Sequence, residues 1–276
     1  MMWAMAEAEG RPGTEGIAGL DTSVAHPARV YDYWLGGKDN FAADREAAER
    51  VLAAAPGLRF RVRANRAFLG RTTRYLAAEA GIRQFLDIGT GIPTGDNTHE
   101  VAQLAAPAAR VVYVDNDPIV LLHAQALLRS TPQGATDYIQ ADLRDPGLIL
   151  DRAAALLDFS QPVAVMMLAI LHFIPDTDDP PAITARFTDV LVPGSYLTLS
   201  ATTSDIDGER VTRATGDFNT QRVASQFFPR THAEIAACFA GLELVEPGLV
   251  PLPRWRALAS PADQVPVYGG VARKPG

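Results

Sequence analysis

The sequence has little cysteine and no long apolar run. Cys238 is the only cysteine among 276 residues, which excludes an internal disulfide framework or a cysteine-based zinc cluster and fits a reducing compartment. The longest apolar run, VAVMMLAIL at 163–171, has the length of a buried strand and is too short to span a membrane. The start of the chain has neither a cationic segment nor an apolar run long enough for a secretory signal, so we expect a cytoplasmic protein.

An excess of positive charge is also missing, because 25 lysines and arginines face 32 aspartates and glutamates, for a net charge of −7. This balance argues against a protein that coats nucleic acid or an anionic membrane. The stretch from Arg59 to Arg74 nevertheless holds six arginines and no acid, which keeps an RNA partner as an alternative. Those arginines fall on several helical faces, so a solvated helix is favoured. The five histidines lack metal-ligand spacing, and no metal site is predicted.

The chain after residue 81 alternates between short apolar runs and amphipathic segments. This pattern predicts an α/β fold, with a mostly parallel sheet and helices on both faces. Two weaker runs near the end, GLELVEP and VPVYGGVAR, are expected to form an antiparallel hairpin that closes a seven-stranded sheet. We expect a flexible tail over 1–22, a helical cap over 23–80, and the α/β domain over 81–276 with an insertion near 203–230.

The motif FLDIGTGIPTG, residues 85–95, joins a buried strand directly to a glycine turn. Gly89 and Gly91 would let the backbone approach a ligand at the carboxyl end of the strand. The dinucleotide fingerprint requires a third glycine where Thr94 stands, so a nicotinamide cofactor is disfavoured. Asp87 instead suits a cationic ligand without a pyrophosphate, and S-adenosylmethionine is such a ligand. The alternative is a glycine turn that binds nothing.

The next three strands are expected to bring suitable side chains to the same edge of the sheet. Asp115 ends the second strand, where a carboxylate can bind both hydroxyls of a ribose, and its alternative role is a helix cap. Asp142 follows the third strand, where it would meet the adenine amino group unless it is a plain turn residue. The fourth strand brings Leu168, Ala169 and His172 to this edge. His172 is a candidate general base, with a structural histidine as the alternative.

Together these motifs resemble class I S-adenosylmethionine-dependent methyltransferases. The resemblance is closest to a bacterial family of S-adenosyl methyltransferases whose substrates are largely undetermined. It runs from about Pro27 to the C-terminus through ARVYDYWLGGKDNFAADREAAERVL, RANRAFLGR, QFLDIGTGIPT, VVYVDNDP, QADLRDP and LHFIPD. The resemblance implies a Rossmann-like fold with an N-terminal helical cap and S-adenosyl-L-methionine as cofactor. Pro93 departs from the general pattern, which often has a third glycine there. The cofactor-binding residues expected are Asp87, Gly89, Thr90, Gly91, Asp115, Asn116, Asp142, Leu143, Leu168 and Ala169.

The stretch YDYWLGGKDN, residues 31–40, is a candidate lid, because methyl transfer requires a nucleophile held close and away from water. Its aromatic side chains would stack on cofactor or substrate, its glycines would allow a tight turn, and its polar residues would meet the cofactor's carboxylate or ribose. The alternative is that the aromatics fix the cap to the sheet and the glycines end a helix. The candidate substrate or lid residues are Tyr31, Tyr33, Trp34, Gly36, Gly37, Lys38, Asp39, Asn40 and, on the following helix, Asn65.

The expected function is methyl transfer from S-adenosyl-L-methionine to a small-molecule acceptor by in-line displacement, with His172 as the candidate base. Two alternatives stay open. One is an RNA methyltransferase that uses the arginine-rich helix. The other is a non-catalytic module that keeps the nucleoside pocket for binding alone.

Overall fold

The computed structural model describes residues 21–127, 129–257 and 265–276, so the tail expected over 1–22 lies almost wholly outside the described residues. Five parallel strands form the centre of one sheet, in the order β3-β2-β1-β4-β5. All but the edge strand β3 are almost fully buried, as parallel strands covered on both faces are, and β4 is apolar throughout. The strands are β1 (Gln84–Ile88), β2 (Arg110–Asp115), β3 (Ala135–Gln140), β4 (Ala164–Leu168) and β5 (Tyr196–Thr202).

The sheet has eight strands, which corrects the predicted seven. The last long strand, β8 (Val267–Arg273), runs antiparallel to β5, and the run GLELVEP pairs antiparallel with it, as expected. Its other edge pairs with two short strands in succession, β6 (Glu243–Leu244) and β7 (Val250–Pro251). The strand that the sequence did not predict is β7. It is only two residues long and contains a proline, which cannot donate a ladder hydrogen bond and is confined to sheet edges.

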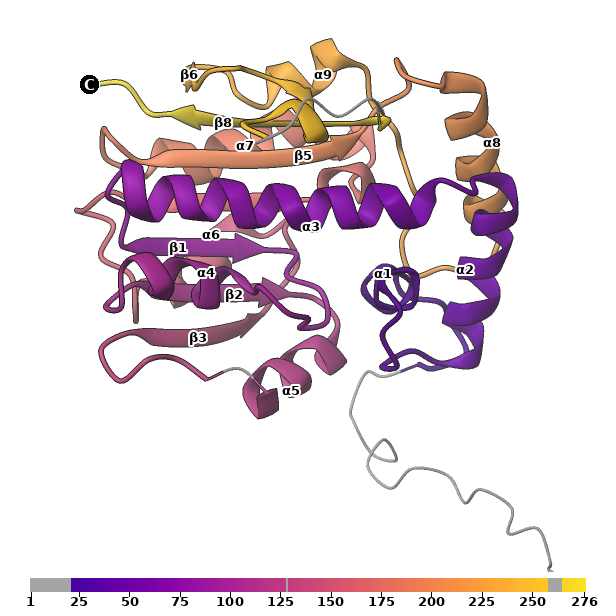
Figure 1. Ribbon diagram of the computed structural model, residues 1–276, viewed down its shortest axis with the longest axis horizontal. Coiled ribbons are helices and arrows are strands. Elements are labelled where there is room, and N and C mark those ends of the chain that lie inside the picture. Colours follow the sequence, from indigo (N-terminus) through magenta and orange to yellow (C-terminus); the bar gives the residue numbers. More distant parts are fainter. Residues whose placement is uncertain (1–20, 128, 258–264) are drawn as a thin grey trace, which may run out of the picture.

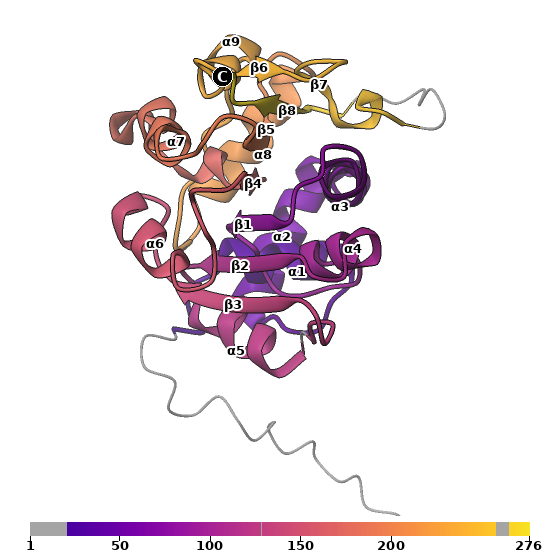
Figure 2. The same ribbon diagram turned by 90° about the vertical axis from the view of Figure 1, so that its left-hand side faces the viewer.

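Helices cover both faces of the sheet (Figures 1 and 2). Three of them begin at a side-chain cap. Asn97 and Glu100 form a capping box, while Asp145 and Asp179 each cap a helix whose first residue is proline. One face is covered by α3 (Leu58–Arg74) and α4 (Thr98–Ala105), and the other by α6 (Pro146–Ala153) and α7 (Pro180–Asp189). The predicted Rossmann-like fold is therefore confirmed, with the strand order reversing between β1 and β4.

Two further helices and several short segments complete this part of the molecule. α5 (Pro118–Leu127) contacts β2 and β3, and α9 (His232–Ala237) begins at a capping box of Thr231 and Glu234. A π-helical turn, η1 (Tyr75–Glu79), continues α3, and short 3₁₀ turns follow β4 and β7. No helix within the described ranges is both long and apolar enough to cross a membrane.

The cap and the insertion share one apolar cluster beyond the carboxyl ends of the strands (Figure 1). It joins α1 (Pro27–Leu35) and α2 (Ala42–Ala54) to α8 (Gly208–Asn219), the helix of the insertion. α3 belongs to both parts of the molecule: Val62 lies in this cluster, whereas Phe68 packs in the core on the sheet. The long helix therefore fixes the cap above the strand ends.

Candidate active site

A cavity of about 330 Å³ lies at the carboxyl ends of β1, β2 and β4, at the point where the strand order reverses. All ten residues predicted for cofactor binding line it, from Asp87 in the first strand to Ala169 after the fourth. Tyr31 of α1 and Asn65 of α3 close the cavity from the cap side. Ligands of open α/β sheets bind at this place.

The glycine turn after β1 requires its glycines. Gly89 and Gly91 have positive φ angles of 76° and 69°, which other residues adopt at a cost. A Cβ atom on Gly89 would lie 2.1 Å from Cδ1 of Ile170. The Gly91 N–H donates to Oδ2 of Asp115 at 2.8 Å, and the Asp117 N–H donates to Oδ1 of the same carboxylate at 3.0 Å. Asp115 thus fixes the turn and retains lone pairs for a ligand.

Two carboxyls at this end of the sheet are buried, and neither forms an ion pair with another described residue. Asp87 is 4% exposed and accepts a hydrogen bond from Thr98 Oγ1 at 2.5 Å. Burial is the main cause that raises its pKa to about 6, and burial likewise raises the pKa of Asp115. A cationic ligand would stabilise both carboxylates, so these acids fit the ammonium-bearing, sulfonium-bearing nucleoside predicted from the sequence.

Asp142 differs from these two acids because an arginine holds it. Arg144 donates to both carboxylate oxygens, at 2.9 Å from Nε and 2.7 Å from Nη2, and these bonds lower the pKa of Asp142. Oδ1 also accepts from the Arg144 N–H at 2.9 Å, so it is Oδ2 that keeps a lone pair for an adenine amino group. Sequence reasoning missed Arg144, although its place two residues after Asp142 in DLRDP was the available signal.

A hydrogen-bonded chain connects the cap to the end of β4. The Asn65 amide donates to Tyr31 Oη at 3.2 Å, and Ser200 Oγ donates to Asn65 Oδ1 at 2.7 Å. Ser200 Oγ also accepts from the Ala169 N–H at 3.0 Å. Ala169 has a φ of 55°, a conformation that a non-glycine residue keeps only when its surroundings fix it. Asn65, a candidate substrate or lid residue, makes no bond to loop 36–40 here and supports Ala169 through Ser200.

A second cavity, of about 90 Å³, opens beside the first, between the cap helices and α8. Tyr31, Asn65, Ala169 and Phe173 line both cavities. Trp34 lines only the second, and its Nε1 donates to the Ala48 carbonyl at 3.2 Å. This cavity is almost entirely apolar and aromatic, in contrast to the acidic first cavity.

His172 lines the second cavity and lies outside the first. Its ring is buried against Phe173 and Phe227, with centroid distances of 4.6 and 4.3 Å. Nδ1 lies 3.4 Å from the Thr202 N–H and accepts from it. Burial, with a smaller contribution from Arg230, lowers the pKa of His172 to about 3, so the ring is neutral near pH 7.

Most of the predicted lid stretch lines neither cavity. The Asp32 carboxylate accepts from the Asp39 N–H at 3.0 Å and from Asn40 Nδ2 at 2.8 Å. A Cβ atom on Gly37 would lie 1.8 Å from Oδ1 of Asp32, so the turn needs glycine there. The glycines thus end α1, which is the alternative that the sequence left open. The predicted residues outside both cavities are Tyr33, Gly36, Gly37, Lys38, Asp39 and Asn40.

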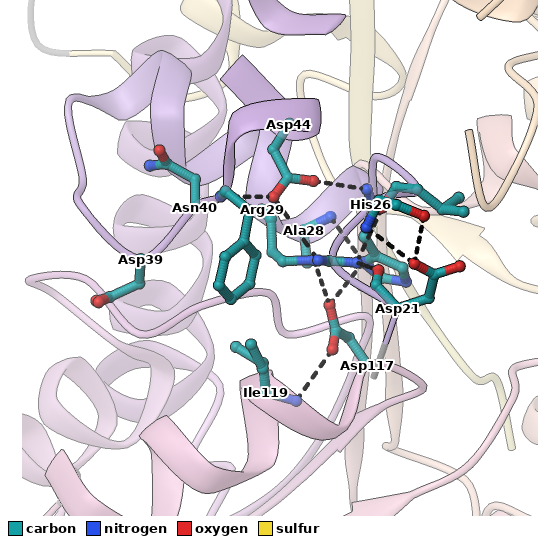
Figure 3. Close-up of polar contacts among 12 residues, drawn as sticks. Asp21, His26, Ala28, Arg29, Asp39, Asn40, Asp44, Asp117 and Ile119 are labelled. Carbon is teal, nitrogen blue, oxygen red and sulfur yellow. Dashed lines mark hydrogen bonds and ion pairs between the residues drawn. The ribbon is translucent and has the colours of Figure 1, made fainter. Parts of the chain in front are cut away.

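A buried ionic cluster joins the cap to the loop after β2 (Figure 3). Asp117 Oδ2 lies 3.1 Å from both His26 Nδ1 and Arg29 Nε, and Asp44 Oδ1 accepts from the His26 N–H at 2.9 Å. Asp117 Oδ1 also accepts from the Ile119 N–H at 3.0 Å, at the start of α5. Because Asp117 follows Asp115 by two residues, this cluster holds α1 against the cavity.

The described parts of the chain hold no group of three or more His, Cys, Asp or Glu arranged to bind a metal ion.

Residues 14–275 match the model of a family described as S-adenosyl methyltransferase. A solved structure of a DUF574 family protein from Streptomyces avermitilis is 48% identical, covers 92% of this chain and 99% of its own, and has a TM-score of 0.88.

A second solved structure comes from Thermobifida fusca and is provisionally named a methyltransferase. It is 40% identical, covers 96% of this chain and 100% of its own, and has a TM-score of 0.86. No protein of curated function matches the chain. The family match and these two structures agree with the acidic cavity at the strand ends. The chain therefore belongs to the S-adenosyl methyltransferase family, whose enzymes use S-adenosyl-L-methionine as cofactor.

Proposed function

We propose that the chain transfers a methyl group from S-adenosyl-L-methionine to a small-molecule acceptor held in the second cavity. The observation that carries this proposal is the junction of the two cavities, where Tyr31, Asn65 and Ala169 line both. An acidic cavity suited to the cofactor opens there onto a small apolar one. In-line displacement requires donor and acceptor to meet across such a junction, away from water.

The cofactor supplies an electrophilic methyl group on a sulfonium. We assign Asp115 to the ribose hydroxyls, Asp142 to the adenine amino group and Asp87 to the ammonium side. Gly89 and Gly91 leave room for the ligand beside the backbone. Thr90, Asn116, Leu143 and Leu168 complete the proposed cofactor site. Asp115 is supported best, because its carboxylate is already oriented by two backbone N–H groups.

Catalysis is proposed to rest on positioning, without a base from His172. Because Nδ1 of this ring accepts from the Thr202 N–H, the neutral ring carries its proton on Nε2. No ring lone pair is then left for the acceptor's proton, and a pKa of about 3 describes a weak base. His172 instead forms part of the wall of the acceptor cavity.

A small-molecule acceptor is favoured over RNA because several arginines of the arginine-rich helix α3 donate hydrogen bonds to backbone carbonyls of the chain itself. Arg59 donates to the Trp34 carbonyl, Arg66 to the Gly95 and Asp96 carbonyls, and Arg71 to carbonyls near Trp255. These guanidinium groups are engaged within the chain and do not form a basic stripe. Retention on RNA that weakens steeply with salt would favour the RNA alternative instead.

The division into a cap over 23–80 and a domain over 81–276 stays a proposal, as does a cytoplasmic location, which rests on the single buried cysteine.

Calorimetric titration of the full chain with S-adenosylhomocysteine and, separately, with NAD tests the proposed cofactor site. We expect binding of the first and none of the second. Binding of NAD without binding of S-adenosylhomocysteine would overturn the proposal, and binding without turnover of any acceptor would favour the nucleoside-binding module.

A further inference from the structure

The second cavity contains one charged side chain, and it is positive. Its lining includes Arg61 of α3 and no aspartate or glutamate. The other polar groups that line it, among them His172 and Thr215, are neutral. The neighbouring cofactor cavity is lined by three carboxylates and two guanidinium groups, and one of these, that of Arg144, is paired with Asp142. Acids are thus in excess there, whereas the only charge on the lining of the second cavity is positive and would attract an anion.

The positive charge of Arg61 has no close carboxylate partner among the described residues. Its side chain is 11% exposed, and its nearest carboxylate, Asp207, lies 4.0 Å from Nη2. That carboxylate is shared, because Arg210 approaches the same oxygen to 3.0 Å and Asp207 is 39% exposed. Burial lowers the pKa of the Arg61 guanidinium, but an arginine stays charged in proteins. A buried guanidinium with a distant partner has free donors for a planar anion.

The walls around Arg61 favour a flat apolar ligand. Phe173 and Phe227 meet edge to face at 5.3 Å, and Phe218 and Trp34 line the same cavity. Aromatic rings bind well among such edges and faces. A volume of about 90 Å³ limits the ligand within this cavity to a single ring or a short branched chain.

The position of Arg61 along α3 indicates which end of the ligand reacts. Asn65 lines both cavities, whereas Arg61, four residues earlier, lines only the second. Four residues of helix correspond to roughly 6 Å along the axis. An anion bound by Arg61 is therefore set back from the junction, and a different group of the ligand reaches the cofactor.

We infer that the methyl acceptor is a monocyclic aromatic acid that binds Arg61 through its carboxylate and presents a separate hydroxyl or amine at the junction with the cofactor cavity. This inference rests on the proposed function, because it takes the second cavity as the acceptor site. In the transfer, the acceptor's oxygen or nitrogen lone pair forms the new bond to the methyl carbon as the carbon–sulfur bond breaks. The sulfur keeps the bonding pair, and the acceptor's proton leaves to solvent.

The test uses the full chain saturated with S-adenosylhomocysteine and titrated calorimetrically with meta- and para-hydroxybenzoate and with the matching neutral hydroxybenzamides. A charge-assisted pair predicts that the better hydroxybenzoate binds about tenfold more tightly than its amide. Arg61→Gln should abolish that preference. Arg63→Gln, at an exposed arginine on the same helix, should retain it. Asp207→Asn, which removes the competing carboxylate, should strengthen hydroxybenzoate binding by up to about fivefold.

The affinity for S-adenosylhomocysteine, measured first for every variant, separates the two proposals. If the unmodified chain does not bind S-adenosylhomocysteine, the proposed function itself is contradicted. If S-adenosylhomocysteine binds normally, three results overturn only the aromatic-acid inference. They are equal affinities for the hydroxybenzoates and their amides, no binding of any hydroxybenzoate, and a preference for the hydroxybenzoates that survives Arg61→Gln.

Discussion

The Asp115 carboxylate accepts a hydrogen bond from the Gly91 N–H at 2.8 Å, so the acid that ends β2 holds the glycine turn that follows β1. The two strand ends are thereby coupled: the residue assigned to the ribose also fixes the backbone that must lie beside the ligand. The second oxygen accepts from the Asp117 N–H, and Asp117 in turn contacts His26 and Arg29 of the cap. The chain of contacts from turn to cap passes through this one carboxylate.

Replacing Asp115 by asparagine is expected to weaken binding of S-adenosylhomocysteine by roughly ten- to hundredfold, because two charge-assisted acceptors for the ribose are lost. Asp151→Asn, at an exposed aspartate of α6, is the matched control and should bind as the unmodified chain does. Calorimetric titration measures both. Equal affinities in the two variants would exclude Asp115 from the ribose site.

The raised pKa of Asp87 predicts that ligand affinity depends on pH. In the free chain, burial raises this pKa from 3.8 to about 6, and an ammonium group of the ligand beside Asp87 favours the ionised carboxylate. Affinity for S-adenosylhomocysteine should therefore increase as the pH rises from 5 to about 7 and then level off. Asp87→Asn should bind more weakly at pH 7 and lose most of this dependence. An unchanged pH profile in that variant would show that Asp87 does not face the ligand's ammonium group.

The same raised pKa has a consequence for stability with a definite sign. A carboxyl whose folded pKa exceeds its unfolded value destabilises the fold above about pH 6, where the buried group must ionise. Asp87→Asn should thus be at least as stable as the unmodified chain at pH 7, although it binds ligand less well. Urea denaturation separates this effect from a folding defect.

Ser200 should stabilise the junction, because its hydroxyl connects the Asn65 amide to the Ala169 N–H. Ser200→Ala is expected to lower the free energy of unfolding by about 1–3 kcal/mol, since it leaves Asn65 Oδ1 without its buried donor. Thr198→Val is an informative control on the same strand. Its hydroxyl is buried without a hydrogen-bond partner among the described residues, so its loss should leave stability unchanged or raise it.

His172 should make the fold less stable at acid pH. Burial depresses its folded pKa from 6.5 to about 3, so protons bind preferentially to the unfolded chain and stability falls as the pH drops below about 6. His172→Gln should reduce this loss by about 1.4 kcal/mol per pH unit between pH 6 and 4. His232→Gln, at an exposed histidine, should leave it unchanged. A wild-type slope in His172→Gln would contradict a buried neutral ring.

The parts of the fold that sequence could predict are those encoded within a few residues. The apolar run before Gly89 indicated a strand end, and the alternation of apolar and amphipathic segments indicated the helices between the strands; the structure confirms both. The two-residue strand β7 carried no such pattern. The turn at Gly37 depends on the Asp32 side chain, which the sequence shows only as another acid beside a tyrosine.

The site divides in the same way. The ten residues predicted for the cofactor follow strand ends, and parallel strands bring such residues to one edge, so they line one cavity. The bond from Ser200 to Asn65 joins positions 135 residues apart, and no local pattern marks it. The second cavity likewise depends on how α8 meets the cap helices, a contact between segments distant in the sequence.

A crystal structure of the chain with bound S-adenosylhomocysteine tests the central claim most directly. The account predicts the nucleoside in the 330 Å³ cavity, with the ribose hydroxyls on Asp115, the adenine amino group near Asp142, and the sulfur at the junction beside Asn65 and Ala169. A ligand bound elsewhere, or one whose sulfur faces away from the second cavity, would contradict it.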